Sequence, residues 1–322
     1  MTVADKVAFA RTQFRLFRIP LSRLSRIAEE LDALREIARL SREQWDAAGR
    51  RGKRPEQKFL PIIGPSGAGK STAIAAYAEA LPQATDTNHR FGQIVHVTLS
   101  AQATTKRLGS DILEAYEDPD FEQGSATKLL RRANNHIEMA RTRILVLDEI
   151  HHLIDNDKGG KTAWSVTETI KKILISGTCP LVLVGTELSL PLLTTNNQLK
   201  NRGYPPIILP ALDLDEPLDR QTFLEHVAGF DLKLVEHKIF ARRSNLVAGD
   251  IPACVYDVSR GIIGVAANLF ENAAVAAIRR NGDSIERRDL QEAVRTWAIP
   301  FKVTDYDPFE HGARELKVKK VL

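Results

Sequence analysis

The sequence has little of what builds disulfide-rich or membrane-spanning proteins. Its only cysteines are Cys179 and Cys254, which are far apart and lack metal-ligand spacing. This argues against a disulfide framework and for a reducing compartment. No apolar run approaches the roughly 20 residues that a membrane-spanning helix needs. The N-terminus has no basic region followed by an apolar block, so we see no secretory signal and expect a cytoplasmic protein.

The excess of positive over negative charge is also small, but the charged residues are unevenly distributed along the chain. The formal net charge is +4, with 43% hydrophobic and 27% charged residues, an ordinary balance for a folded globular protein. Residues 1–58 hold 14 Lys and Arg against 8 Asp and Glu, and residues 311–322 hold 4 against 1. Two interpretations stay open: the basic ends contact a polyanion, most commonly nucleic acid, or they simply solvate exposed helices and a loose tail.

The first 58 residues contain two helix signals and one linker signal. Apolar residues at spacings of three and four predict an amphipathic helix that begins near Ser22 or Ser25. Ser41 with Gln44 three residues later resembles a capping box and predicts a second, short helix. Residues 50–55 are rich in arginine and are interrupted by Gly and Pro, which predicts an exposed basic linker.

Short apolar runs then alternate with helical stretches, a pattern typical of a parallel sheet built from βαβ units. The runs cover residues 59–63, 94–98, 144–147, 181–184 and 207–209. Beyond Leu214 only helical patterns remain, at residues 217–226, 251–258, 265–279 and 287–298. We predict an α/β fold with a nucleotide-binding core and a small all-helical C-terminal lid. The predicted boundaries are a helical N-terminal extension at 1–58, the core at 59–212, the lid at 213–300 and a basic tail at 301–322.

A glycine-rich segment follows the first predicted strand and precedes a helix predicted from Thr72. It fits the P-loop pattern with Gly64, Pro65, Ser66, Gly67, Ala68, Gly69, Lys70 and Ser71. In such a loop, backbone N–H groups and the helix N-terminus surround the phosphates. Lys70 then reaches the β and γ phosphates and Ser71 ligates Mg²⁺. We predict ATP and Mg²⁺ as cofactors, with Thr72 as a further nucleotide contact.

The apolar run at 144–147 ends in two acids, Asp148 and Glu149, about 80 residues after the loop. We expect Asp148 to hold the nucleotide's Mg²⁺ and Glu149 to orient and polarise the attacking water. This pair favours an ATPase over a small-molecule kinase, which needs no such glutamate.

Two further residues are candidates for catalysis. Thr186 ends the strand-like run at 181–184 and is predicted to sense the γ-phosphate, with an ordinary turn residue as the alternative. Arg202 lies 16 residues further on, at a position that suits an arginine finger acting on a neighbouring subunit's nucleotide. The alternative for Arg202 is an exposed surface side chain.

His151 and His152 follow the two acids directly and raise the question of zinc. Adjacent residues on a regular helix or strand do not converge on one metal, and no Cys or further His has the required spacing. We therefore expect no zinc site.

The motif set resembles the AAA+ ATPases of transposition, the TniB/TnsC group and, more distantly, the MuB and IstB proteins. The resemblance covers residues 59–298 and is carried by GPSGAGKS, ILVLDEIHHL, LVLVGTELS, the Asn201-Arg202 pair and the lid-like stretch SRGIIG to DLQEA. It implies an AAA+ fold and an ATP-dependent regulator that oligomerises on double-stranded DNA, as a ring or helical filament. It also implies a transposase and a target-selection adaptor as partners, with hydrolysis driving disassembly.

The resemblance further implies DNA-backbone contacts from the segment after the second strand. The residues that match this segment are Thr104, Thr105, Lys106 and Arg107, and weaker candidates from the following helix are Lys128, Arg131 and Arg132. Such phosphate contacts give affinity without sequence readout. The alternative for Lys106 and Arg107 is an ordinary solvated helix face. One departure stands out: many AAA+ lids place an arginine three residues after the turn glycine, whereas this chain has Gly264 three residues after Gly261.

Two other functions remain as alternatives. The first is another nucleic-acid AAA+ ATPase, such as an initiator or helicase loader, although the roughly 25 residues after Trp297 are too few for the winged-helix domain expected of many initiators. The second is a signalling or chaperone-like ATPase that acts on protein and never binds DNA, which the basic ends fit less well.

Overall fold

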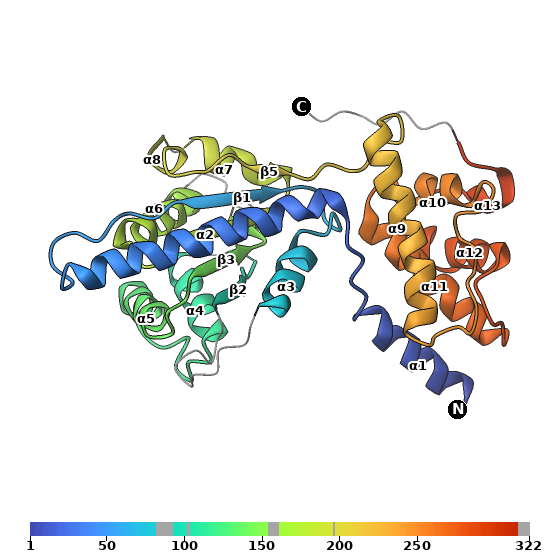
Figure 1. The fold of residues 1–322 in the computed structure, drawn as a ribbon, viewed down its shortest axis with the longest axis horizontal. Coiled ribbons are helices and arrows are strands. Elements are labelled where there is room, and N and C mark those ends of the chain that lie inside the picture. Colours follow the sequence, from blue (N-terminus) through green and yellow to red (C-terminus); the bar gives the residue numbers. More distant parts are fainter. Residues whose placement is uncertain (82–92, 102–103, 154–160, 196, 315–322) are drawn as a thin grey trace. The chain divides into compact units, whose positions relative to one another are not determined.

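The computed structural model describes all residues except 82–92, 102–103, 154–160, 196 and 315–322 (Figure 1). The described residues form two compact units. The α/β unit comprises Ser25–Pro65 and Lys70–Leu209, and the helical unit comprises Met1–Leu24, Ser66–Gly69 and Pro210–Leu322. The first 58 residues are thus shared between the units, while the domain boundaries given above stay a prediction.

The α/β unit is built on a five-stranded sheet in the order β2-β3-β4-β1-β5. Every pairing is parallel. The strands are β1 (Phe59–Ile63), β2 (Ile94–Thr98), β3 (Ile144–Asp148), β4 (Leu181–Gly185) and β5 (Ile207–Ile208). β1, β3 and β4 are buried throughout, as apolar strands covered on both faces must be. The predicted α/β fold with a parallel sheet is confirmed.

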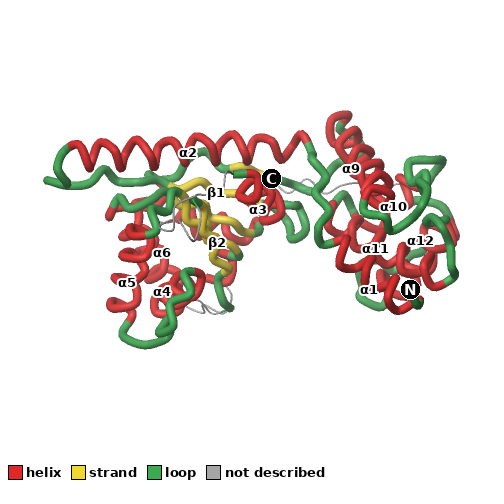
Figure 2. The backbone as a smooth tube through the Cα atoms, turned by 60° about the horizontal axis from the view of Figure 1, so that its bottom comes forward, coloured by secondary structure: helices red, strands yellow, loops and turns green. Residues whose placement is uncertain are grey.

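Helices cover both faces of this sheet (Figures 1 and 2). One apolar cluster joins alternate strand residues to α4 (Thr105–Ala115), α5 (Ala126–Met139) and α6 (Lys161–Ser176). The other face is covered by α2 (Ser22–Ala47) and α3 (Lys70–Ala80), which are linked by hydrogen bonds from Arg35 to Tyr77 and from Tyr77 to Asp32. The short helices α7 (Leu190–Thr195) and α8 (Asn197–Lys200) precede β5.

The segment before β1 differs from its prediction in two respects. α2 is a single helix through Ser41, so the second helix start was wrong. The Ser41 hydroxyl is buried and accepts a hydrogen bond from Gln57 Nε2 at 2.8 Å instead of capping a helix. The basic linker is anchored at one point, because Arg54 forms an ion pair with Glu138 at 2.6 Å and its side chain is only 11% exposed.

The helical unit, whose helices are drawn in Figure 1, encloses a second apolar core. Its helices are α1 (Val3–Phe14), α9 (Pro217–Glu236), α10 (Ile251–Ser259), α11 (Ile263–Arg279), α12 (Arg287–Ala293) and α13 (Pro308–His311). α12 continues as a π-helical turn, Val294–Ala298. α1, which the sequence analysis did not predict, buries Ala10 in this core. Among the described residues no single helix is long and apolar enough to cross a membrane. Within the same residues, only the pair α10 and α11 together has the length and apolar composition of a membrane span, and the two helices are bent by 117° relative to each other.

The start of the basic tail is held in place. The Arg314 backbone N–H donates to Asp257 at 2.8 Å, and its guanidinium forms an ion pair with the same buried carboxylate at 2.7 Å. The expectation of a loose, exposed tail is therefore wrong for Arg314 and for α13, whose Phe309 is buried, while residues 315–322 of the predicted tail lie outside the described residues.

His226 of α9 is buried in the core of the helical unit. Its Nε2–H donates to the carbonyl of Ile263 at 3.1 Å, and burial lowers the pKa of His226 from 6.5 to about 4. The unfolded chain therefore binds a proton more readily than the folded one between these pH values. Stability from this group is complete above pH 6.5 and is lost as pH falls toward 4.

We predict that the helical unit loses roughly 3 kcal/mol of stability from this histidine between pH 6.5 and 4. In His226→Gln, which keeps a side-chain donor but cannot titrate there, this part of the pH dependence should vanish. The check is denaturant unfolding of wild type and variant across this range, with the exposed His311→Gln as control. Equal pH slopes in His226→Gln and wild type would contradict the assignment.

Candidate nucleotide site

The phosphate loop begins where β1 ends. Gly64 N donates to Gly185 O of β4 at 3.1 Å, which continues the sheet by one residue. A Cβ on Gly64 would lie 2.3 Å from the carbonyl oxygen of Leu209, a distance that no side chain tolerates. Glycine is therefore required for the chain to leave the sheet between β4 and β5.

Lys70, the first residue of α3, is enclosed by its own loop. It is 8% exposed, and its Nζ donates to Gly64 O at 2.7 Å and Pro65 O at 2.8 Å. Burial lowers the pKa of Lys70, while the carboxylates of Asp148 and Glu149 act in the opposite direction. An ammonium group has three donors, so one remains for a further acceptor, such as a phosphate oxygen.

Ser71 and Asp148 meet at the carboxyl ends of the strands. The Ser71 hydroxyl donates to Asp148 Oδ2 at 2.5 Å, and the Nε2–H of His96 donates to the same oxygen at 2.9 Å. Burial raises the pKa of Asp148, but the hydrogen bonds from His96, Ser71 and the Glu149 backbone outweigh it, so the net shift is downward. Asp148 is thus held as a carboxylate beside a hydroxyl.

His96 was missed by the sequence analysis. The signal available was one polar side chain inside the otherwise apolar strand Ile-Val-His-Val, on an edge strand that pairs directly with β3. That signal alone does not separate a solvent-facing residue from a partner of Asp148.

Glu149 turns the chain out of β3. Its φ is +61°, in the left-handed region that costs a non-glycine residue about 1–2 kcal/mol. Its side chain is 41% exposed, and Oε2 lies 3.1 Å from Nδ1 of His151. Strain of this kind is often found at functional positions, where it fixes the direction of a side chain.

Thr186 follows β4, which lies between β3 and β1 in the sheet. This order places Thr186 between Asp148 and the phosphate loop. Its hydroxyl is buried and has no hydrogen-bond partner within the described part of the chain. The geometry suits the predicted sensor, and the role stays a prediction.

Arg202 lies at the other end of β1. Its carbonyl accepts from Phe59 N at 3.0 Å, and its guanidinium pairs with Glu56 at 2.8 Å. The five residues of β1 separate it from Gly64 by about 16 Å at 3.3 Å per residue. Arg202 is therefore too far away to serve its own chain's phosphate loop, and the predicted action on a neighbouring subunit stays a prediction.

The turn of the loop, Ser66–Gly69, belongs to the helical unit and contacts the start of α11. Gly264 N donates to Gly67 O at 2.9 Å, and a Cβ on Gly264 would lie 2.8 Å from Gly67 Cα. A side chain at position 264 is thus incompatible with this contact. The missing lid arginine has a steric reason.

Three of the predicted DNA contacts, all at the start of α4, take part in internal interactions. So does Arg132 of α5, whose guanidinium pairs with Asp118. The Thr104 hydroxyl caps α4 by accepting from Arg107 N, and the Thr105 hydroxyl bonds with that of Ser165 at 2.8 Å. The Arg107 guanidinium pairs with Asp111 at 3.0 Å. These contacts stabilise the start of α4 and leave less of these side chains available for a phosphate.

The other three predicted contacts, Lys106, Lys128 and Arg131, are exposed. They lie on α4 and α5, which pack against each other. None has an acidic partner among the described residues. These cations are the better candidates for the predicted interface.

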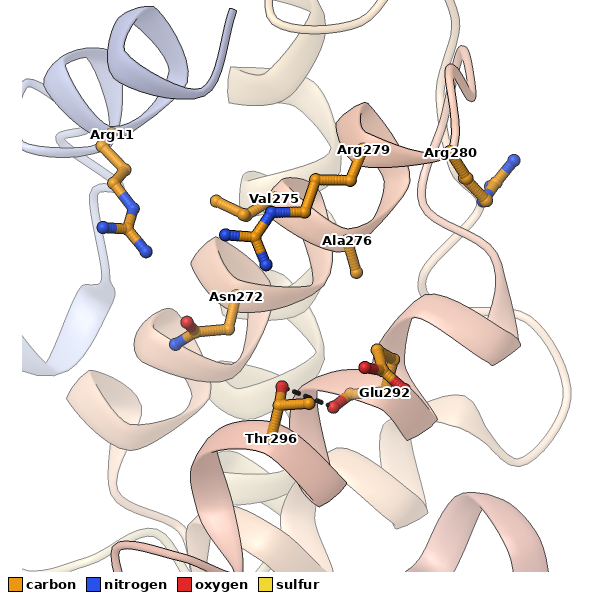
Figure 3. Close-up of a pocket in the computed structure, with 8 residues that line it drawn as sticks. All are labelled: Arg11, Asn272, Val275, Ala276, Arg279, Arg280, Glu292 and Thr296. Atoms are coloured by element: carbon orange, nitrogen blue, oxygen red, sulfur yellow. Dashed lines mark hydrogen bonds between the residues drawn. The ribbon is translucent and has the colours of Figure 1, made fainter. Parts of the chain in front are cut away.

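A separate cavity of about 340 Å³ lies in the helical unit (Figure 3). Arg11, Arg279 and Arg280 contribute to its lining, but Arg11 lies 3.9 Å from Glu271 and Arg280 pairs with Asp289. Only one of the three guanidinium groups thus lacks an acidic partner within the described residues. The charge is too small for a nucleotide's phosphates, and the strand-end site remains the candidate.

The strand-end residues fit a magnesium nucleotide. Hydroxyl and carboxylate oxygens, the ligands that Mg²⁺ prefers, lie together at Ser71 and Asp148, next to the buried ammonium of Lys70. When bound, the ion would neutralise charge on the β and γ phosphates.

The parallel sheet, the loop between β1 and α3 and the acids after β3 define the class: the chain has the AAA+ P-loop fold. The family model described as "Bacterial TniB protein" matches residues 23–212, more than half of the chain. The chain belongs to the TniB family, which confirms the resemblance noted from the motifs. No curated protein matches the sequence.

Solved structures share the fold at low identity. The ORC1 protein of Aeropyrum pernix in complex with DNA matches with a TM-score of 0.57 and 19% identity over 85% of this chain and 64% of that one. The Cdc6 protein of Pyrobaculum aerophilum matches with a TM-score of 0.57 and 14% identity over 88% and 70%. The Aeropyrum pernix ORC2 protein, with ADPNP and ADP, gives 0.55 and 13% over 82% and 66%. The chain thus spans slightly less than two thirds of the two Aeropyrum proteins.

We predict that Lys70→Ala abolishes ATP binding, because it removes the enclosed ammonium that faces the loop carbonyls. Binding of a fluorescent ATP analogue measures this directly. Lys172→Ala, which removes an exposed lysine of α6, is the matched control and should bind as wild type does. Unchanged affinity in Lys70→Ala would exclude Lys70 from the site.

Proposed function

We propose that this protein is an ATP-dependent, DNA-binding regulator of DNA transposition. It oligomerises through its nucleotide site on double-stranded target DNA, recruits and activates the transposase, and disassembles when ATP is hydrolysed. The observation that carries the ATPase part is the meeting of Ser71 and Asp148 beside the enclosed Lys70. Membership of the TniB family supports the transposition part.

Each residue of the site has a role in this proposal. Lys70 and the loop bind the phosphates, Ser71 and Asp148 hold the metal, and Glu149 orients the attacking water. Thr186 contacts the γ-phosphate from β4. Because Arg202 is at the far end of β1, its charge serves the site of a neighbouring subunit, which makes hydrolysis depend on assembly.

DNA binding is proposed on two grounds. Lys106, Lys128 and Arg131 present positive charge on α4 and α5 that has no acidic partner in the described part of the chain, and one structure with the same fold is a complex with DNA. Contacts of this type are made with phosphates and carry no sequence information. A target-selection adaptor protein is then needed to choose the site.

Two alternatives are separated from this proposal by experiment. The ORC and Cdc6 folds keep an initiator or helicase loader as the second candidate. A protein-directed ATPase is the third, and it predicts no duplex binding in any nucleotide state.

We expect tight binding to a labelled duplex of random sequence with ATP or a non-hydrolysable analogue, and weak binding with ADP or no nucleotide. The affinity should fall steeply with salt, by a log–log slope of about −0.9 for each phosphate contact. Lys106→Ala and the pair Lys128→Ala/Arg131→Ala should each weaken binding and flatten this slope, whereas Lys172→Ala should do neither. Absence of binding in every nucleotide state would favour the protein-directed ATPase.

Glu149→Gln should retain ATP and DNA binding but lower the hydrolysis rate by roughly 100-fold or more, the usual contribution of a positioned acid–base group. The assembled state should therefore persist on DNA. Phosphate release and the lifetime of the protein–DNA complex are the two measurements. Faster disassembly in Glu149→Gln would rule out this carboxylate as the group that activates water.

A further inference from the structure

The turn after β3 brings Glu149, His151 and His152 together. One ligand atom from each residue lies within 4.8 Å of the others, and all three side chains are partly buried. The expectation that the two adjacent histidines do not converge was wrong. It assumed a regular helix or strand, whereas these residues lie on a single 3₁₀ turn, Ile150–Leu153.

The geometry of that turn explains the convergence. Glu149 directly precedes this turn, and its φ of +61° bends the chain out of β3 there. His152 N donates to Glu149 O at 3.0 Å and closes the turn. His151 completes the group, because its ring lies 4.5 Å from that of His152 and its Nδ1 lies 3.1 Å from Glu149 Oε2.

These distances fit the donor set of a metal. Ligand atoms in a tetrahedral site at about 2.0–2.1 Å from zinc lie roughly 3.4 Å apart, so small side-chain rotations suffice. Two imidazoles and one carboxylate, with water in the fourth position, form a recurrent zinc ligand set. Mg²⁺ instead prefers oxygen ligands, so Ser71 and Asp148 suit a different ion.

We propose that Glu149, His151 and His152 bind a divalent transition-metal ion such as Zn²⁺, and that the bound ion inhibits ATP hydrolysis. The second part rests on the proposed role of Glu149. A carboxylate that coordinates a metal no longer orients the attacking water, while Lys70, Ser71 and Asp148 still bind the nucleotide. The metal would therefore hold the protein in its ATP-bound state, as the Glu149→Gln substitution is expected to do.

The first experiment measures metal binding alone, on the full chain with saturating Mg²⁺ and no nucleotide. Calorimetry with Zn²⁺ should give one site, and Co²⁺ should develop the visible absorption of a tetrahedral complex. His151→Ala and His152→Ala should each weaken binding about tenfold or more, and the double variant should abolish it. His311→Ala, at an exposed histidine of α13, should bind as wild type does. Equal binding by wild type and the double variant, or none by wild type, would overturn the site.

The second experiment measures phosphate release with Mg²⁺ and ATP as Zn²⁺ is added, and each variant is normalised to its own rate without Zn²⁺. Wild type should be inhibited at the Zn²⁺ concentration that fills the calorimetric site, with ATP binding retained. Inhibition that persists in the double variant would place the ion elsewhere, for example on Ser71 and Asp148, and would overturn the regulatory part. Absence of hydrolysis by wild type with Mg²⁺ alone would instead refute the proposed ATPase role, whatever the metal binding shows.

Discussion

The parallel pairing of β1, β4 and β3 is the constraint on which the rest of the α/β unit depends. Because the three strands run in the same direction, their carboxyl ends open at one edge, where the phosphate loop, Asp148, Glu149 and Thr186 leave the sheet. The hydrogen bond between Ser71 and Asp148 joins two of these ends across 77 residues of sequence. A shift of one residue in the register of β3 would turn Asp148 to the opposite face and separate this pair.

Much of this arrangement could be predicted from the sequence. The five strands were found because buried parallel strands are short, apolar and bounded by polar residues, and the loop and acids were found because their spacing is chemically restrictive. The lid helices followed from their 3.6-residue periodicity. Signals of this kind depend on residues close together in the sequence, so they do not change with the tertiary contacts that the segment makes.

The errors share a physical cause, which is that the deciding partner is distant in sequence. Ser41 looked like a helix cap, but Gln57 uses its hydroxyl. Arg54 and Arg314 looked like solvated charges, but Glu138 and Asp257 fix them. α1 has a weak apolar pattern and is stabilised by the core of the helical unit. The roles of three histidines also depend on tertiary structure. His96 contacts Asp148 on the neighbouring strand, and His151 and His152 lie close to Glu149 only because of the local 3₁₀ turn.

The contact between Gly264 and Gly67 has a consequence for how the loop is coupled to α11. An arginine at position 264 would attract negatively charged groups, and this attraction would weaken as the ionic strength rises. An amide–carbonyl hydrogen bond between two glycines carries no net charge and responds only to the path of the loop backbone. Within the helical unit, α11 is therefore coupled to the turn at Gly67 by a contact whose strength ionic conditions hardly change.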